Sequence, residues 1–247
     1  MIEREIEIRM SDGTAESVLY SLDGGRRWPG VIHLTDIGGI RQAHRDMARR
    51  LAVEGYTVLM PNVYYRTRRV PLFDFPPNFG GDEKTTQRLA ELTGPLTAEA
   101  MERDALSYTE YLALSDSAGP GPMGVVGYCA TGAFAMRIAA AHPEKIAAAA
   151  SFHGGRLFTD DPASPHLLLP RIKAALYCGH AIQDRSMTAE AIEKFNRALE
   201  SWGGQYESEI YEGARHGWTV PDNPAYNQTQ AERAFQKLTD LLAKTLK

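Results

Sequence analysis

The stretch GVVGYCATGAFAMRIAAA, residues 124–141, decides the fold class of this chain. Its apolar start predicts a buried strand, and its alanine-rich end, from residue 130 onward, predicts a helix. Cys129 lies between the two, among small residues: Gly127, Ala130 and Gly132. A sharp turn from strand to helix that carries a serine or cysteine is a nucleophile elbow, which holds that side chain out above the sheet. The sequence therefore makes Cys129 a candidate nucleophile.

Cys129 also has a plain structural interpretation. Free cysteines are among the most buried residue types, so a small thiol suits a packed turn. Cys178, in a short apolar run, fits that interpretation well. The small residues around Cys129 favour the elbow, and the choice depends on whether an acid and a base follow it.

An acid and a histidine follow Cys129 in the order that α/β-hydrolases require, which is nucleophile, acid, histidine. Asp184 comes just after the apolar run at residues 174–178, and His216 follows the predicted strand at residues 206–211. Groups on loops at the carboxyl ends of parallel strands meet in one crevice of an open α/β sheet. We therefore expect Cys129, Asp184 and His216 to form a catalytic triad.

The other histidines have simpler interpretations. His153 follows the predicted strand at residues 146–152, so it either lines the pocket or makes a local hydrogen bond. His180 lies near Asp184 but on no predicted strand of its own, which favours His216 as the base. The remaining histidines are assigned to the core, to helix surfaces and to an irregular segment: His33, then His44 and His142, then His166.

Apolar runs and helical spacing alternate along the whole chain. Strands are predicted at residues 2–8, 15–22, 31–34, 57–60, 124–126, 146–152, 174–178 and 206–211. Helices are predicted at residues 42–54, 97–114, 130–141, 188–202 and 227–246. This alternation indicates an α/β fold whose mostly parallel central sheet has helices on both faces. No repeat or linker divides residues 1–247, so we expect a single domain.

Residues 61–81 are rich in aromatic residues, proline and glycine, and they fit neither a helix nor a strand. A loop of this length inside a compact domain is usually functional or mobile. We expect a pocket wall or a lid, with plain surface packing as the alternative. Its basic residues, Arg66, Arg68 and Arg69, are expected in solvent, and binding of an anionic substrate is the alternative.

Composition excludes several other classes of function. The chain has 247 residues, of which 43% are hydrophobic and 23% charged, as in an ordinary globular protein. Its formal net charge of -4 gives no basic footprint for nucleic acid. No apolar run approaches the ~18 residues of a membrane span, and the N-terminus does not resemble a signal peptide, so a cytoplasmic location without membrane contact is expected. The two cysteines lack metal-ligand spacing, which predicts reduced thiols and no metal site.

At the level of these motifs the chain resembles the dienelactone hydrolase family. The resemblance covers most of the sequence from residue 31 to residue 246. Three segments resemble the catalytic segments of that family: GYCATGA at residues 127–133, the loop with Asp184, and YEGARHGW at residues 211–218. Two more resemble its N-terminal half: HLTDIGGI at residues 33–40 and EGYTVLMPNVYYRT at residues 54–67.

The resemblance implies a single-domain α/β-hydrolase that opens an enol-lactone through a Cys, His, Asp triad, without metal or organic cofactor. It makes Cys129 the nucleophile, His216 the base and Asp184 the acid that orients the base. The backbone N–H groups of Ala130 and Ile37 are then expected to form the oxyanion hole.

Three positions depart from the family pattern. Asp36 stands where the family usually has a glutamate that helps control the charge of the thiol, and it is one methylene shorter. Thr131 stands where a glycine is usual, so its branched side chain narrows the elbow. His216 is followed by no arginine, although the family binds the substrate carboxylate with one there; Trp218 lies in that segment. Asp36, His153 and Trp218 are the expected residues of the substrate pocket.

We therefore expect a hydrolase that cleaves a lactone or carboxylic ester through a thiol-ester intermediate. The alternatives are a general carboxylesterase or thioesterase with the same triad, and a non-catalytic α/β-hydrolase scaffold that binds a small molecule. The expected partner is a small-molecule lactone or ester, and both a monomer and a homodimer stay open.

Overall fold

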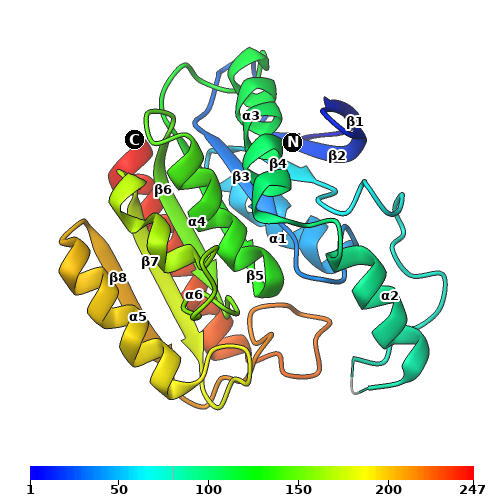
Figure 1. The fold of residues 1–247 in the computed structure, drawn as a ribbon. Coiled ribbons are helices and arrows are strands. Elements are labelled where there is room, and N and C mark those ends of the chain that lie inside the picture. The colour runs from blue at the N-terminus through cyan, green and yellow to red at the C-terminus, as the bar shows by residue number, and fades with distance from the viewer. Residues whose placement is uncertain (80) are drawn as a thin grey trace.

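An eight-stranded sheet forms the centre of the computed structural model, which describes residues 1–79 and 81–247 (Figure 1). In spatial order the strands are β1 (Ile2–Met10), β2 (Gly13–Ser21), β4 (Thr57–Pro61), β3 (Gly30–Leu34), β5 (Met123–Tyr128), β6 (Ile146–Phe152), β7 (Ala175–Ala181) and β8 (Tyr206–Tyr211). The pairs β1·β2 and β2·β4 are antiparallel, and the pairs from β4 to β8 are parallel. The expected mostly parallel sheet is confirmed.

Helices cover both faces of this sheet, as the alternation of strands and helices predicts. They are α1 (Gln42–Val53), α2 (Glu83–Thr93), α3 (Ala98–Leu114), α4 (Gly132–Ala141), α5 (Ala189–Trp202) and α6 (Gln228–Leu246). One core contains residues of α3, α4 and α5, and the other contains residues of α1 and α6. Figure 1 shows α3 and α4 on the near side of the sheet and α6 on its far side.

The central strands alternate between these two cores. Ile32 and Val125 pack into the core with α3 and α4, whereas their neighbours Val31 and Val126 pack into the core with α1 and α6. Successive side chains of a strand point to opposite faces, so a strand that is covered on both faces reads as a continuous apolar run. This is why the short apolar runs in the sequence identified the strands.

Two elements differ from the sequence-based expectation. Strand β7 continues to Ala181, so His180 lies on a strand, where it is buried and hydrogen-bonded to Ser208 (3.0 Å). Helix α2 was not expected, because its sequence has few apolar residues. Its start is nevertheless capped by Asp82, whose side chain accepts the Thr85 N–H (2.9 Å).

The aromatic-rich segment at residues 61–81, of which residue 80 lies outside the described residues, is held by ion pairs. Arg66 donates to both carboxylate oxygens of Asp104 at 2.7 Å, and its side chain is only 9% exposed. The expectation that Arg66 lies in solvent is therefore wrong. Arg68 and Arg69 also pair with acidic side chains. Among the described residues, no helix is both long and apolar enough to cross a bilayer.

Candidate active site

The register of the parallel strands brings several loops to one edge of the sheet. Leu34 of β3 pairs with Gly127 of β5, and Ala181 of β7 pairs with Tyr211 of β8. The loops that follow these strands therefore open side by side, as in other open α/β sheets. These loops, together with the one after β6, carry most of the candidate residues: Asp36, Ile37, Cys129, His153, Asp184 and His216.

The elbow at Cys129 has the strained backbone that its sequence predicts. Cys129 follows β5 with φ of 56°, in the left-handed region that non-glycine residues rarely occupy. A Cβ atom on Gly127 would lie 2.2 Å from the carbonyl oxygen of Thr131, and one on Gly132 would lie 2.4 Å from the Ser151 Oγ. Both positions therefore require glycine for the strand and the helix to approach closely.

The side chain of Thr131 forms hydrogen bonds within the elbow and does not line the cavity. Its buried Oγ1 accepts the Tyr128 N–H (2.9 Å), donates to the Tyr128 carbonyl oxygen (3.0 Å) and lies 3.4 Å from the carbonyl oxygen of Leu34. The threonine that departs from the family pattern thus stabilises the turn after β5, close to the end of β3.

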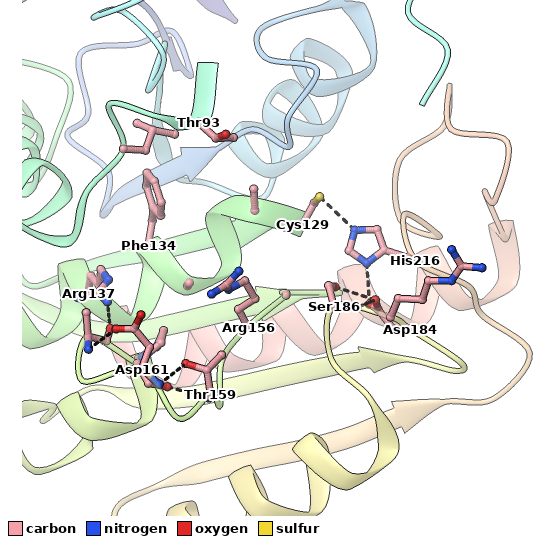
Figure 2. Close-up of a pocket in the computed structure, with 18 of the residues that line it drawn as sticks. Thr93, Cys129, Phe134, Arg137, Arg156, Thr159, Asp161, Asp184, Ser186 and His216 are labelled. Atoms are coloured by element: carbon pink, nitrogen blue, oxygen red, sulfur yellow. Dashed lines mark hydrogen bonds and ion pairs between the residues drawn. The ribbon is translucent and has the colours of Figure 1, made fainter. Parts of the chain in front are cut away.

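His216 lies within hydrogen-bond distance of both Cys129 and Asp184, as Figure 2 shows. The Cys129 Sγ is 3.0 Å from the His216 Nε2, and the His216 Nδ1 is 2.6 Å from the Asp184 Oδ2. The other carboxylate oxygen of Asp184 accepts hydrogen bonds from the backbone N–H and the hydroxyl of Ser186, at 2.8 and 2.7 Å. The structure therefore brings together the three residues that sequence order selected.

The electrostatics of this chain favour a charged imidazole. Burial by itself would lower the pKa of His216, but the contacts with Asp184 and Cys129 outweigh it and raise the pKa to about 10. Burial would raise the pKa of Asp184, but the contacts with His216 and Ser186 hold it below its usual value. A protonated imidazole 3.0 Å from sulfur stabilises a thiolate, which is the nucleophilic form of cysteine. This arrangement can therefore support nucleophilic attack by Cys129 at neutral pH.

His153 and Trp218 were expected to line the substrate pocket, but both are buried and neither lines the cavity. His153 is 1% exposed; its Nδ1 accepts the Cys129 N–H (3.1 Å), and its Nε2 lies 2.8 Å from the Thr219 Oγ1. Burial, with a smaller contribution from His216, lowers the pKa of His153 to about 3, so the ring is neutral. Trp218 is fully buried against the His153 ring. Both side chains are therefore part of the protein interior, where His153 contacts the backbone of Cys129.

Asp36 is likewise buried, and its contacts differ from those the resemblance implied. Its carboxylate forms two hydrogen bonds with Arg41 (2.6 and 2.9 Å) and accepts the Gly38 N–H (2.8 Å). Burial would raise the pKa of Asp36, but His44 and Arg41 outweigh it and hold the pKa far below its usual value. Arg41 also forms two hydrogen bonds with Asp222 (2.8 and 2.9 Å). Asp36 therefore anchors the loop that carries Ile37 and does not line the cavity.

His44 was expected at a helix surface, and the structure shows that this is wrong. Its ring is fully buried, with Nδ1 3.0 Å from the His33 Nε2, and with Nε2 3.2 Å from the Asp36 backbone nitrogen and 3.4 Å from the Asp36 Oδ1. Helical spacing alone gave no sign of this, because the partners come from β3 and from the loop after it. His33 is in the core, as expected.

A cavity of about 1160 Å³ opens beside the thiol, and Cys129, Ala130 and His216 line it. Leu34 and Gly127 are paired in the sheet, and Ile37 and Ala130 follow them at the same distance along the chain. Ala130 lines the cavity, but Ile37 does not. The segment at residues 61–81 was expected to form a pocket wall or a lid, but none of its described residues lines the cavity. Residues of α2, α3 and α4 form a wall of the cavity instead. Among the described residues, no cluster of histidine, cysteine or acidic side chains could hold a metal ion.

Sequence reasoning missed three arginines that line the cavity on loops after β6, β7 and β8: Arg156, Arg185 and Arg215. None of their guanidinium groups forms an ion pair with a described residue. The closeness of Arg185 to Asp184 and of Arg215 to His216 was visible in the sequence, where they are neighbours, whereas Arg156 gave no such signal.

Comparisons with known proteins identify the family and the fold of this chain. The model of the dienelactone hydrolase family matches residues 16–246. The carboxymethylenebutenolidase of Rhodococcus opacus is 29% identical over 201 residues, which is 79% of this chain and 73% of that protein. A dienelactone hydrolase-like promiscuous phosphotriesterase from metagenomic libraries superimposes with a TM-score of 0.80 at 18% identity, covering 100% of this chain and 99% of the other. A dienelactone hydrolase from Anabaena variabilis gives a TM-score of 0.66 at 18% identity, with coverage of 100% and 99%. The two solved structures share the fold.

Proposed function

The chain belongs to the dienelactone hydrolase family, and we propose that it hydrolyses a lactone or carboxylic ester through Cys129, His216 and Asp184. The observation that carries the proposal is the continuous chain of contacts from sulfur to imidazole to carboxylate, at 3.0 and 2.6 Å, on the wall of the large cavity. Such a chain is the arrangement of a nucleophile, its base and the group that orients the base.

In the first half of the reaction, the Cys129 thiolate attacks the ester carbonyl carbon. The N–H groups of Ala130 and Ile37 stabilise the oxyanion, and one such donor contributes about 3 kcal/mol of transition-state stabilisation. The carbonyl re-forms as the ester C–O bond breaks, and the leaving oxygen takes the proton of the His216 imidazolium. The acyl group is then bound to sulfur as a thiol ester.

In the second half, the neutral His216 removes a proton from a water molecule as that water adds to the thiol ester. The C–S bond breaks, which releases the carboxylic acid and restores the thiolate and the imidazolium. Asp184 keeps the imidazole in the tautomer that presents Nε2 to sulfur and to water in turn. In a lactone both oxygen-bearing groups stay in one product molecule.

The charge of the cavity bears on which esters are accepted. Arg156, Arg185 and Arg215 line it without ion-pair partners among the described residues. A guanidinium group binds carboxylates through paired hydrogen bonds. We therefore expect esters that carry a carboxylate to be accepted, even though no arginine follows His216 at the position that the family uses.

The test compares the wild type with Cys129→Ala in the hydrolysis of p-nitrophenyl acetate. Activity is expected to fall by at least about 10³-fold, as when a catalytic nucleophile is removed. Cys178→Ala is the matched control, because Cys178 is buried and burial raises its pKa to about 12. Mass spectrometry of acid-quenched wild type should find the acetyl group on the peptide that contains Cys129.

A Cys129→Ala protein that keeps the wild-type rate would contradict the nucleophile assignment. A folded wild type that hydrolyses no member of a panel of lactones, aryl esters and acyl thioesters would favour a small-molecule-binding role instead. Comparing panel members with and without a carboxylate tests the expected contribution of the cavity arginines.

A further inference from the structure

One side of the cavity is formed by uncharged residues of α2, α3, α4 and the α2–α3 connection. We call this side the apolar lobe: Thr93, Leu96, Met101, Ala133 and Phe134. In Figure 2, Thr93 and Phe134 lie on the side of Cys129 that faces away from His216. The three free arginines come from other loops, after β6, β7 and β8. Asp161 also lines the cavity, but the uncharged lobe lies on one side of the thiol, whereas Arg185 and Arg215 adjoin Asp184 and His216 on the other side.

The size of the cavity exceeds what a small lactone requires. Its volume of about 1160 Å³ lies just above the range of about 300–1,000 Å³ that is usual for sites that bind drug-sized ligands. A single five-membered lactone ring would leave most of this space to water. The apolar side chains of the lobe would then stay hydrated, and the free energy of burying them would be lost.

The charged residue next to the apolar lobe does not change its chemistry. Arg137 lies one turn of α4 beyond Ala133 and lines the cavity, but its side chain is only 7% exposed. Its guanidinium donates to Glu102 (3.4 Å) and to the Ala163 carbonyl oxygen. Because its charge is paired with Glu102 and its side chain is almost fully buried, Arg137 contributes mainly its apolar stem to the cavity wall.

We propose that the apolar lobe binds a large apolar substituent of the ester substrate, an alkyl chain or an aromatic ring that is attached to the reacting ester group. This inference rests on the proposed function, because attack by Cys129 fixes where the ester lies. The substrate is then an ester or lactone with one bulky apolar arm, which sets it apart from a small polar dienelactone.

The test measures kcat/KM along two series of esters. In the acyl series, p-nitrophenyl acetate, butyrate, hexanoate and octanoate keep one leaving group while the acyl chain grows. In the leaving-group series, phenyl acetate and 2-naphthyl acetate enlarge the other side of the ester. Each methylene buried in the lobe should raise kcat/KM about fourfold, so hexanoate should exceed acetate by on the order of 10²-fold.

Two variants with the same substitution locate the effect. Ala133→Phe fills the apolar lobe and should reduce the ratio of hexanoate to acetate kcat/KM to near one. Ala225→Phe is the matched control, because Ala225 also lines the cavity but lies on the loop after His216, outside the lobe. This control should keep the wild-type ratio.

The proposal is overturned if kcat/KM stays flat or falls in both series, or if the wild-type preference survives Ala133→Phe. Calorimetric titration of the Cys129→Ala protein with octanamide and butanamide separates this result from failure of the proposed function. Tighter binding of octanamide that is lost in Cys129→Ala/Ala133→Phe supports the lobe even if no ester is hydrolysed. Equal binding of both amides, in an enzyme whose esterase activity depends on Cys129, refutes the lobe alone.

Discussion

Replacing Arg41 by methionine should destabilise the protein more than removing any exposed ion pair does. Arg41 joins two carboxylates: that of Asp36, whose side chain is 8% exposed, and that of Asp222, whose side chain is 47% exposed. Methionine keeps much of the apolar stem and removes the guanidinium. The two broken contacts have very different energies, because one carboxylate is buried and the other is largely hydrated.

The magnitude follows from these exposures. Loss of the partner of a buried charge costs about 3–5 kcal/mol. Asp36 keeps the Gly38 N–H (2.8 Å) and its neighbour His44, so the lower end, about 3 kcal/mol, is expected for Arg41→Met. The exposed pair with Asp222 should contribute at most about 1 kcal/mol, so Asp222→Asn should cost no more than that.

Urea unfolding of the wild type, Arg41→Met, Asp222→Asn and Arg41→Met/Asp36→Asn measures these costs. The double variant should be more stable than Arg41→Met alone, because it leaves no buried charge without a partner. kcat should also fall, by up to about 10²-fold if the Ile37 N–H is displaced, with little change in KM. If Arg41→Met costs no more than Asp222→Asn, the buried carboxylate does not depend on Arg41 and the reasoning is wrong.

Two further predictions concern the histidines. The folded-state pKa of His216, about 10, lies above its ordinary 6.5, so its contribution to stability is full below pH 6.5 and is lost as pH rises toward 10. The difference in unfolding free energy between wild type and His216→Gln should shrink over that interval, and a difference that grows with pH would contradict the assignment. His153→Leu, which leaves the Cys129 N–H without its acceptor, should lower kcat about 10-fold or more at constant KM, whereas His153→Asn, which can still accept it, should lose less. Equal kcat values for the two variants would show that the hydrogen bond does not position the thiol.

The closeness of Cys129, Asp184 and His216 was predictable because the elements that carry them leave local patterns in the sequence. Short apolar runs identify strands that are buried on both faces, and the helices between them identify a parallel sheet. Once the sheet is parallel, residues that follow different strands meet at one edge, which places Cys129, Asp184 and His216 together. The glycines around the elbow were also recognisable in the sequence as residues that a tight turn requires. The structure gives the reason, since a side chain at Gly127 would clash with the backbone of Thr131.

The contacts that hold the site in place were not predictable, because no local sequence pattern shows which polar side chains will pair. Arg41 lies five residues after Asp36, but nothing in the sequence shows that it turns toward Asp36 and toward the distant Asp222. His44 has the spacing of a helix surface, yet it meets a histidine of β3 in the core. Helix α2 has only three apolar residues, Leu89, Ala90 and Leu92, so the sequence reasoning did not recognise it as a helix and did not predict the wall that it contributes to the cavity.

The segment that follows His216 explains why an arginine can be absent from it. Thr219 lies 2.8 Å from the His153 Nε2, and the other nitrogen of that ring accepts the N–H of the nucleophile. Asp222, three residues further on, binds Arg41, which holds Asp36 and the loop expected to carry one oxyanion donor. One short segment therefore connects the loop of His216 to Cys129 on one side and to the loop of Asp36 on the other. Since its side chains Thr219 and Asp222 contact other residues of the protein, we expect arginines on the neighbouring loops to bind an anionic substrate.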